Sequence, residues 1–266
     1  MLPSVFVPHG SPNFALQPGE AGIRLAQAAA ALPRRARAIV VASAHWDTTN
    51  PTVGAAGQPE TIHDFWGFPE PLYDIRYAAS GSPSVAATIV DRLRAAGFPA
   101  QAILHGIDHA VWIPLRQMFP GAEVPVVPLS IQGSRGPEYH YRLGQALAPL
   151  LDDDILVMGS GNLTHNLRDF QLIKVSRGDT PTYVRAFADW IWQRVEDGDT
   201  SALFEYRRLA PEAVRAHPTE EHLLPLFVAL GAAGNNSHPE RFHTGIDEHV
   251  LAMDAFAFHP RTEMRQ

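Results

Sequence analysis

Short apolar runs alternate with helical segments along this chain, and this alternation restricts the fold more than any other feature. Residues 4–7 and 37–44 are β-rich runs bounded by turn or polar residues, and residues 20–32 between them have helical periodicity. A third run at 155–158 follows a helical segment at 137–151. This order predicts an α/β fold with a central, mostly parallel or mixed sheet flanked by helices.

The rest of the chain continues the pattern. We expect further helices at 82–96, 110–118, 181–195 and 219–231, and further strands at 51–57, 102–104, 124–131 and 250–258. The prolines of 124–131 favour an edge or irregular position, and 250–258 alternates like a closing antiparallel strand. Residues 60–77 show neither helical nor strand periodicity, and their aromatic content indicates an ordered, functional loop. With 266 residues, 45% of them hydrophobic, we expect a single domain over residues 1–266.

The absence of cysteine limits the chemistry, because any metal must then be held by nitrogen and oxygen. A formal charge of −7 and scattered basic residues favour a small-molecule partner over nucleic acid. The sequence has no long apolar stretch and no secretion signal at its N-terminus. We therefore expect a cytoplasmic protein without a membrane partner, either a monomer or a homodimer.

Three of the thirteen histidines follow the predicted buried strands. His9 opens a turn with Gly10, His45 precedes Trp46, and His165 lies in a loop of small residues. Ligands bind outside the carboxyl ends of the strands in sheets of this kind, so we expect a metal site at this edge. His9 and His45 are candidate ligands, whereas the role of His165 as ligand or base stays open.

A further candidate ligand is His222, in the first turn of the helix expected at 219–231, although a helix-surface histidine explains it equally well in isolation. Ferrous oxygenases commonly combine two histidines with one carboxylate. The carboxylates nearest to the candidate histidines in the sequence are Asp47, Glu220 and Glu221. The residues leave open whether the third ligand is a carboxylate or a histidine.

The other histidines fall into two groups. Three form a second tier of candidates: His63, His105 and His109. His63, in the aromatic loop, and His109, at the start of a helix, could each line a pocket. Six have mostly polar surroundings and are expected to be solvated: His140, His217, His238, His243, His249 and His259.

Seven segments, taken in order, resemble the DODA-type extradiol ring-opening dioxygenases, the bacterial and plant DOPA 4,5-dioxygenase group related to the catalytic subunit of protocatechuate 4,5-dioxygenase. They are HGSP (9–12), SAHW (43–46), ETIHDF (60–65), LYDIRY (72–77), DHAVW (108–112), GNLTHN (161–166) and EHLLPL (221–226). The resemblance runs nearly end to end. Two departures bear on pocket shape: Ala110 stands where the family often has glycine, and Ala78-Ala79 replaces a proline-containing pair.

The resemblance implies that a catechol ring is opened by O₂ at a non-haem metal, with His9, His45 and His222 as ligands. His165 would be the catalytic acid/base, or a fourth ligand when zinc is bound, and His109 a second catalytic histidine that contacts substrate. Fe(II) is the metal expected for turnover, and Zn(II) is expected in the purified protein because it binds imidazoles well. Cleavage at the 4,5 and at the 2,3 position are both compatible with the motifs.

Three residues are expected to bind substrate: Trp46, His63 and Arg76. Arg76 can receive a substrate carboxylate through a bidentate pair, and a surface salt bridge is its alternative. The aromatic side chains of the loop at 60–77 are expected to cover the site and exclude water.

Two other functions remain compatible with the same histidines. One is a zinc-dependent hydrolase with a dispersed site, although no His-Glu-x-x-His helix is present. The other is a non-enzymatic binding protein, since the wider superfamily resembles the Memo-type proteins. Retention of every candidate histidine favours catalysis.

Overall fold

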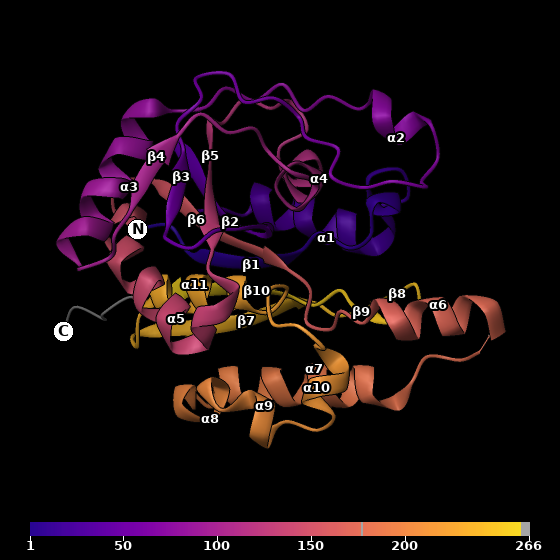
Figure 1. Ribbon diagram of the computed structural model, residues 1–266. Coiled ribbons are helices and arrows are strands. Elements are labelled where there is room, and N and C mark those ends of the chain that lie inside the picture. Colours follow the sequence, from indigo (N-terminus) through magenta and orange to yellow (C-terminus); the bar gives the residue numbers. More distant parts are fainter. Residues whose placement is uncertain (177, 262–266) are drawn as a thin grey trace.

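An eight-stranded mixed sheet forms the centre of the computed structural model, which describes residues 1–176 and 178–261 (Figure 1). The strand order is β4-β3-β5-β2-β6-β1-β10-β7, and β8 and β9 form a separate pair. The strands are β1 Ser4–Pro8, β2 Ala38–Asp47, β3 Thr52–Gly54, β4 Gln101–Ile103, β5 Val126–Ile131, β6 Ile155–Gly161, β7 Ser237–His243, β8 Ile246–Asp247, β9 Leu251–Ala252 and β10 Ala255–Pro260.

Four parallel strands, β5, β2, β6 and β1, make the middle of the sheet. Val40 of β2 lies opposite Val127 of β5 and Val157 of β6, and Val7 of β1 lies opposite Ser160 of β6. β10 is antiparallel to β1, as expected for the closing strand, and β3 is antiparallel to β5. Because β1, β2 and β6 run in one direction, their carboxyl ends meet at the same edge.

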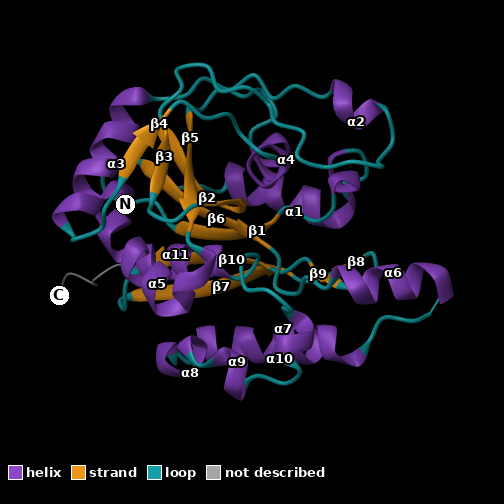
Figure 2. Ribbon diagram, in the orientation of Figure 1, coloured by secondary structure: helices purple, strands orange, loops and turns teal. Residues whose placement is uncertain are grey.

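Helices cover both faces of the sheet (Figure 2). They are α1 Gly19–Ala30, α2 Pro71–Asp74, α3 Pro83–Ala95, α4 His109–Met118, α5 Gly136–Leu147, α6 Leu167–Ser176, α7 Thr182–Glu196, α8 Thr200–Phe204, α9 Tyr206–Leu209, α10 Ala213–Ala216 and α11 Leu224–Ala233. Three 3₁₀ turns lie at Pro12–Ala15, Gly133–Arg135 and Ala148–Leu151.

Strand β6 shows which helices cover which face, because side chains alternate along a strand. Gly159 and Gly161 lie against the start of α11 and the residues before it, whereas the hydroxyl of Ser160 donates to the carbonyl of Ala110 in α4. α11 and α4 therefore lie on opposite faces. α5 packs on α11 and α1 packs on α4, while α7 to α10 form a further layer below β7 and β10 in Figure 1.

Of the edge or irregular position predicted for the strand at 124–131, the edge is wrong, whereas the pairing is irregular, with a register shift against β2. β5 is an internal strand between β3 and β2. Gly54 of β3 makes room for the proline ring, since a Cβ at Gly54 would lie 2.5 Å from Cγ of Pro128. β3 and β5 share only the pair Val53 and Leu129, so the proline interrupts little hydrogen bonding there.

The helix expected at 219–231 begins later than predicted. α11 starts at Leu224 with Pro225 in its first turn, and His222 lies in the turn that precedes it. Thr219 does not cap the helix, because its hydroxyl donates to Oε1 of Glu221 instead. Proline is favoured at the first helical position because it has no N–H to leave unpaired, which explains the later start.

Several elements were not anticipated, namely α6, α8 to α10 and β7. α8 to α10 pack around a second apolar cluster on the α11 side of the sheet, whose largest buried members include Phe187, Tyr206, Phe227 and Phe256. Apolar side chains of α6 and β7 pack against the main core instead. No helix among residues 1–176 and 178–261 is long and apolar enough to cross a membrane.

Candidate active site

Five histidine side chains meet at the edge of the sheet where β1, β2 and β6 end. His9 directly follows β1, His45 lies near the end of β2, and His165 is four residues beyond β6. His109 begins α4, and His222 lies two residues before α11. All five line one cavity of about 530 Å³. Three neighbouring parallel strands thus bring together histidines that are far apart in the sequence.

His9, His45 and His222 form a nearly equilateral triangle. Their ring centroids are separated by 5.1 Å for His9 and His45, 5.2 Å for His9 and His222, and 4.9 Å for His45 and His222. Among the described residues, the ligand atoms of His9, His45 and His109 lie within 4.8 Å of one another, and so do those of His165, Glu221 and His222. The site therefore offers two possible trios of imidazoles that share His9 and His45.

Two carboxylates orient the rings of His45 and His222. Asp64 Oδ2 is 3.3 Å from Nδ1 of His45, and Glu221 Oε1 is 3.2 Å from Nδ1 of His222. A carboxylate accepts the Nδ1–H of a neutral imidazole, which leaves a lone pair on Nε2. The two Nε2 atoms are 3.1 Å apart, so two lone pairs face each other. A cation held between them would stabilise this arrangement.

The candidate ligands are neutral at pH 7. Burial, followed by the charges of neighbouring histidines, lowers the pKa of His9 and of His222 well below the usual 6.5. Burial and His109 also lower the pKa of His45 to about 3, although Asp64 opposes this. Neutral imidazoles are the form that coordinates a metal ion. The donor set therefore fits a divalent first-row transition metal.

His165 and His109 flank this triangle. The ring of His165 stacks on that of His222 with centroids 3.5 Å apart, and the ring of His109 is 4.0 Å from that of His45. Asp64 Oδ1 lies 3.0 Å from Nδ1 of His109, so one carboxylate serves two histidines. Burial and His109 lower the pKa of His165 to about 4, so this imidazole is neutral at pH 7.

Glycines at the end of β6 allow the backbone before α11 to approach the sheet. A Cβ at Gly161 would lie 2.1 Å from the carbonyl oxygen of His222, and that same oxygen accepts the N–H of Asn162 at 3.0 Å. The Asn162 side chain accepts the N–H of Gly10 at 3.1 Å, and its Nδ2 lies 3.3 Å from Nε2 of His9. The segment after β6 thus positions both His222 and His9.

Only one of the carboxylates considered as ligands lies in the cavity. Asp47 accepts the N–H of Gly133, and Glu220 accepts the hydroxyl of Tyr206, and neither lines the cavity. Glu221 does line it, but its carboxylate contacts the outer nitrogen of His222. Sequence reasoning missed Asp64, whose only signal was its place after His63 in the aromatic loop.

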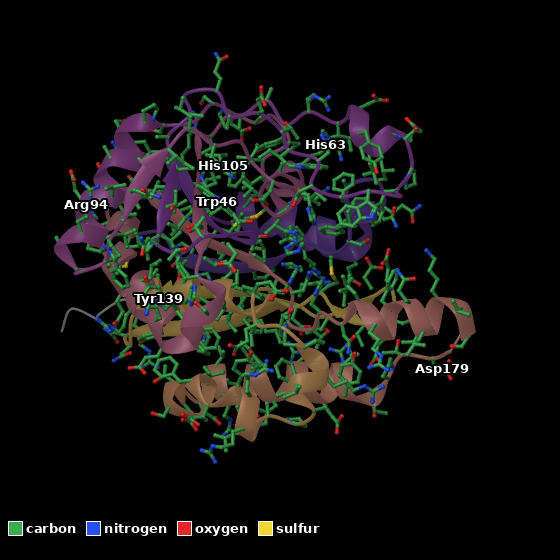
Figure 3. The ribbon with its side chains drawn as sticks, in the orientation of Figure 1. Trp46, His63, Arg94, His105, Tyr139 and Asp179 are labelled. Carbon is green, nitrogen blue, oxygen red and sulfur yellow. The ribbon has the colours of Figure 1, made fainter. Side chains whose placement is uncertain are left out.

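The three expected substrate-binding residues lie beside the cavity and are not among the residues that line it. Trp46 stacks on His105 with centroids 3.9 Å apart, and both are labelled in Figure 3. His63 Nε2 is 3.0 Å from the carbonyl of Ile75, and Arg76 donates to the same carbonyl at 2.9 Å. Their role in substrate binding stays a prediction.

Three histidines expected to be solvated are buried, and the prediction is wrong for them. His140 accepts the N–H of Gln132 at Nε2, and its Nδ1 is 2.7 Å from the carbonyl of Gly136. His217 Nε2 is 2.8 Å from the carbonyl of Leu163. His243 is 7% exposed. Hydrogen bonds to the backbone engage both ring nitrogens of His140 and Nε2 of His217.

Apolar side chains form the outer walls of the cavity. They come from the loop at 60–77 and from α6: Phe65, Trp66, Phe68, Leu167 and Phe170. Trp66 is 85% exposed, which places it at the mouth of the cavity. The expectation that the aromatic loop covers the site holds for Phe65, Trp66 and Phe68, whereas the contribution of α6 was not foreseen.

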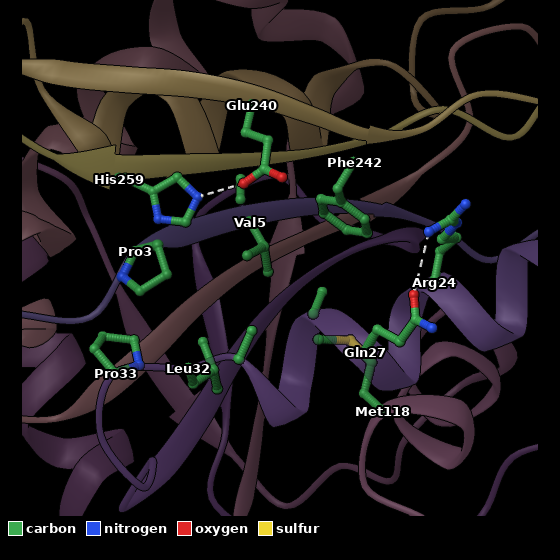
Figure 4. Close-up of a pocket in the computed structure, with 13 residues that line it drawn as sticks. Pro3, Val5, Arg24, Gln27, Leu32, Pro33, Met118, Glu240, Phe242 and His259 are labelled. Carbon is green, nitrogen blue, oxygen red and sulfur yellow. Dashed lines mark hydrogen bonds and ion pairs between the residues drawn. The ribbon is translucent and has the colours of Figure 1, made fainter.

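A second cavity of about 220 Å³ lies between α1 and the strands β1, β7 and β10 (Figure 4). The polar side chains that line it contact one another: Glu240 pairs with His259 at 2.9 Å, and Arg24 donates to Gln27 at 3.3 Å. It holds none of the histidines that meet at the strand ends. The larger, histidine-lined cavity is therefore the candidate active site.

Comparison with known proteins gives matches over almost the whole chain. Residues 11–253 match the family model for the catalytic LigB subunit of aromatic ring-opening dioxygenase. The chain is 37% identical over 257 residues to the 4,5-DOPA dioxygenase extradiol of Beta vulgaris, covering 95% of each. It is 36% identical over 239 residues to the protein of the same name from Escherichia coli (strain K12), covering 87% of this chain and 85% of the relative. A crystal structure of an uncharacterized protein from Escherichia coli K12 matches with a TM-score of 0.78 at 29% identity, over 97% of this chain and 99% of that one.

Proposed function

The chain belongs to the family of the catalytic LigB subunit of aromatic ring-opening dioxygenases, and on that premise we propose that it opens a catechol ring with O₂, using Fe(II) held by His9, His45 and His222. The family implies a metal cofactor, a small aromatic substrate and O₂. The choice of metal, of catechol and of ligand set is the proposal.

One observation carries the ligand assignment, namely the approach of Nε2 of His45 to Nε2 of His222 at 3.1 Å. Both rings have their Nδ1 atoms beside carboxylates, so both direct a lone pair to the same point. His9 completes the trio from the end of β1. His109 is the less suitable third ligand, because it shares the carboxylate of Asp64 with His45 and lies on the side of Phe65.

The metal must be Fe(II) for turnover, since when bound it supplies the one-electron chemistry that lets O₂ react with an aromatic ring. Zn(II) competes for the same nitrogens, because imidazole binds both ions and the affinity order favours zinc. We therefore expect zinc in protein purified without control of the metal.

The chain itself moves the protons and fixes the substrate. His165 is neutral at pH 7 and lines the cavity, so one of its ring nitrogens can accept the proton of a catechol hydroxyl and return it later. His109 is oriented by Asp64 and presents its other nitrogen to the substrate. Phe65 and Phe68 exclude water from the ring. We further propose that Trp46, His63 and Arg76 support binding indirectly, by fixing the loop beside the cavity.

Oxygen consumption tests this function. Metal-free protein is reloaded anaerobically with Fe(II) and given a panel of catechols, among them DOPA, caffeate and protocatechuate, while O₂ uptake and the yellow ring-opened product are followed. We expect uptake that is lost in His165→Ala at unchanged iron content. His238→Ala, an exposed histidine on β7, is the matched control. Absence of uptake on every catechol by iron-loaded protein would contradict the proposal.

Metal binding separates the two possible trios. His222→Ala is expected to weaken binding of Fe(II) and of Zn(II) strongly, whereas His109→Ala should keep the metal and lose turnover. The reverse pattern would assign the third ligand to His109.

A further inference from the structure

We propose that Glu248 makes this site selective for catechols that carry a positively charged amine and no carboxylate. The inference deepens the proposed function and rests on it, because it names the class of catechol. Glu248 lies in the turn between β8 and β9, far in the sequence from every motif considered above.

The charges that line the cavity are all negative. Asp64, Glu221 and Glu248 contribute carboxylates, and among the described residues that line the cavity none is arginine or lysine. Apart from the proposed metal ion, a carboxylate on the substrate would have no cation to pair with there, and it would meet three carboxylates. A substrate ammonium group would meet the opposite sign.

Two of the three carboxylates are already engaged by histidines. Asp64 contacts His45 and His109, and Glu221 contacts His222. Glu248 contacts none of the five histidines through a hydrogen bond or ion pair among the described residues. It is therefore the acidic group of the cavity that is available to a ligand.

The carboxylate of Glu248 is held in place at one oxygen. Its Oε1 accepts the hydroxyl of Ser11 at 2.8 Å and the amide of Asn13 at 3.1 Å. No hydrogen bond between described residues ends on its Oε2. Ser11 is two residues from His9, so Glu248 lies on the His9 side of the cavity. Glu248 and the five histidines line the same cavity, so an amine on a catechol that enters it can meet this oxygen.

Glu248 and His249 are the two central residues of the turn that joins β8 to β9. Glu248 and His249 have φ angles of 46° and 65°, in the left-handed region that non-glycine residues rarely adopt. The turn is maintained by Asp247, whose side chain accepts the N–H of Glu248 at 2.9 Å and whose carbonyl accepts the N–H of Val250 at 3.2 Å. A positive φ at both central residues is the geometry that a tight hairpin turn requires.

Selectivity on a matched panel tests the inference. The probes are dopamine, neutral 4-ethylcatechol, 3,4-dihydroxyphenylpropionate and zwitterionic DOPA, compared by kcat/KM with iron-loaded protein. We expect dopamine to be preferred over 4-ethylcatechol by about tenfold or more, the range of a hydrogen bond between charged groups. The carboxylate should rank last, and DOPA should rank below dopamine.

Glu248→Gln is the decisive variant, because its amide oxygen can still accept from Ser11 and Asn13 while the charge is removed. We expect it to lower the ratio of dopamine to 4-ethylcatechol by about tenfold. Glu240→Gln, at an exposed carboxylate on β7 outside the active-site cavity, is the control and should keep the ratio. A ratio that survives Glu248→Gln, or a wild-type protein that prefers the neutral or acidic catechol, would overturn the inference.

Binding without turnover distinguishes this inference from the proposed function. Calorimetry with zinc-loaded protein measures the same preference for dopamine over 4-ethylcatechol and its loss in Glu248→Gln. If that preference is found but no catechol is opened by iron-loaded protein, the dioxygenase proposal fails and the assignment of Glu248 stands. If catechols are opened without any preference for the amine in either assay, only the assignment of Glu248 fails.

Discussion

Replacing Gly161 by alanine would test how the chain positions His222. The new Cβ would lie 2.1 Å from the carbonyl oxygen of His222, whereas real Cβ atoms essentially never come closer than 3.0 Å to such an atom. The distance between the Cβ and the oxygen must therefore increase by at least about 0.9 Å. The Cβ is fixed to the backbone of β6 and the oxygen belongs to the backbone of His222, so one of the two backbone segments has to move. The hydrogen bond from the N–H of Asn162 to the same oxygen, now 3.0 Å, would lengthen with it.

Two effects of this displacement can be given magnitudes. Overpacking and a weakened buried hydrogen bond together cost about 2 to 4 kcal/mol in the free energy of unfolding, which lowers Tm by roughly 4 to 16 °C in a chain of this size. A ligand moved by nearly 1 Å also no longer directs its Nε2 at the point shared with His45. We expect metal affinity to fall about 10- to 100-fold, as for loss of a group that orients a ligand.

The assays are a chelator-competition titration of the metal and a thermal unfolding curve of metal-free protein. Gly57→Ala is the matched control, because nothing lies within 4 Å of a Cβ at that position. A Gly161→Ala protein that binds the metal within twofold of wild type and keeps its Tm would refute the account of how β6 positions His222.

Three other changes have defined outcomes. Burial lowers the pKa of His140 from 6.5 to about 4, so the folded state binds fewer protons than the unfolded state between these pH values. The free energy of unfolding should thus fall by up to about 3 kcal/mol as the pH drops from about 6.5 to about 4. Urea titrations at pH 7.5 and 4.5 should show a smaller fall in His140→Asn than in the wild-type protein. Asp64→Asn should lower metal affinity about 10- to 100-fold by releasing Nδ1 of His45, and Asp91→Asn, at an exposed carboxylate, is the control. A chelator titration of Asp64→Asn that equals that of the wild-type protein would contradict this. Adding Zn(II) at about 100 times its Kd to metal-free protein should stabilise it by about 3 kcal/mol, and a similar rise in Tm for His222→Ala would speak against the ligand set.

The sequence predicts the edge of the sheet that carries the site because the relevant signals are local. His9, His45 and His165 each follow a buried apolar run, and parallel strands must bring such positions to one edge. The mixed sheet flanked by helices is confirmed for the same reason, since strand and helix periods are short-range patterns. The assignment of His222 came instead from its resemblance to a known family.

What the sequence does not predict depends on contacts between distant residues. Pro128 indicates an edge strand until Gly54, more than seventy residues earlier, is known to lie beside it. Polar surroundings in the sequence suggest that His217 is solvated, but the backbone carbonyl of Leu163, distant in the sequence, binds it. Glu248 has no local signal at all, since its place in the cavity follows from its contacts with Ser11 and Asn13.

The wide spacing of the proposed ligands has a consequence for biosynthesis. His9 and His45 are translated early, but His222 follows only after 221 of the 266 residues have been added. Its backbone must then dock on Gly161 before its imidazole can face His45. A nascent chain that ends before His222 therefore lacks one of the three proposed ligands and cannot complete the proposed metal site.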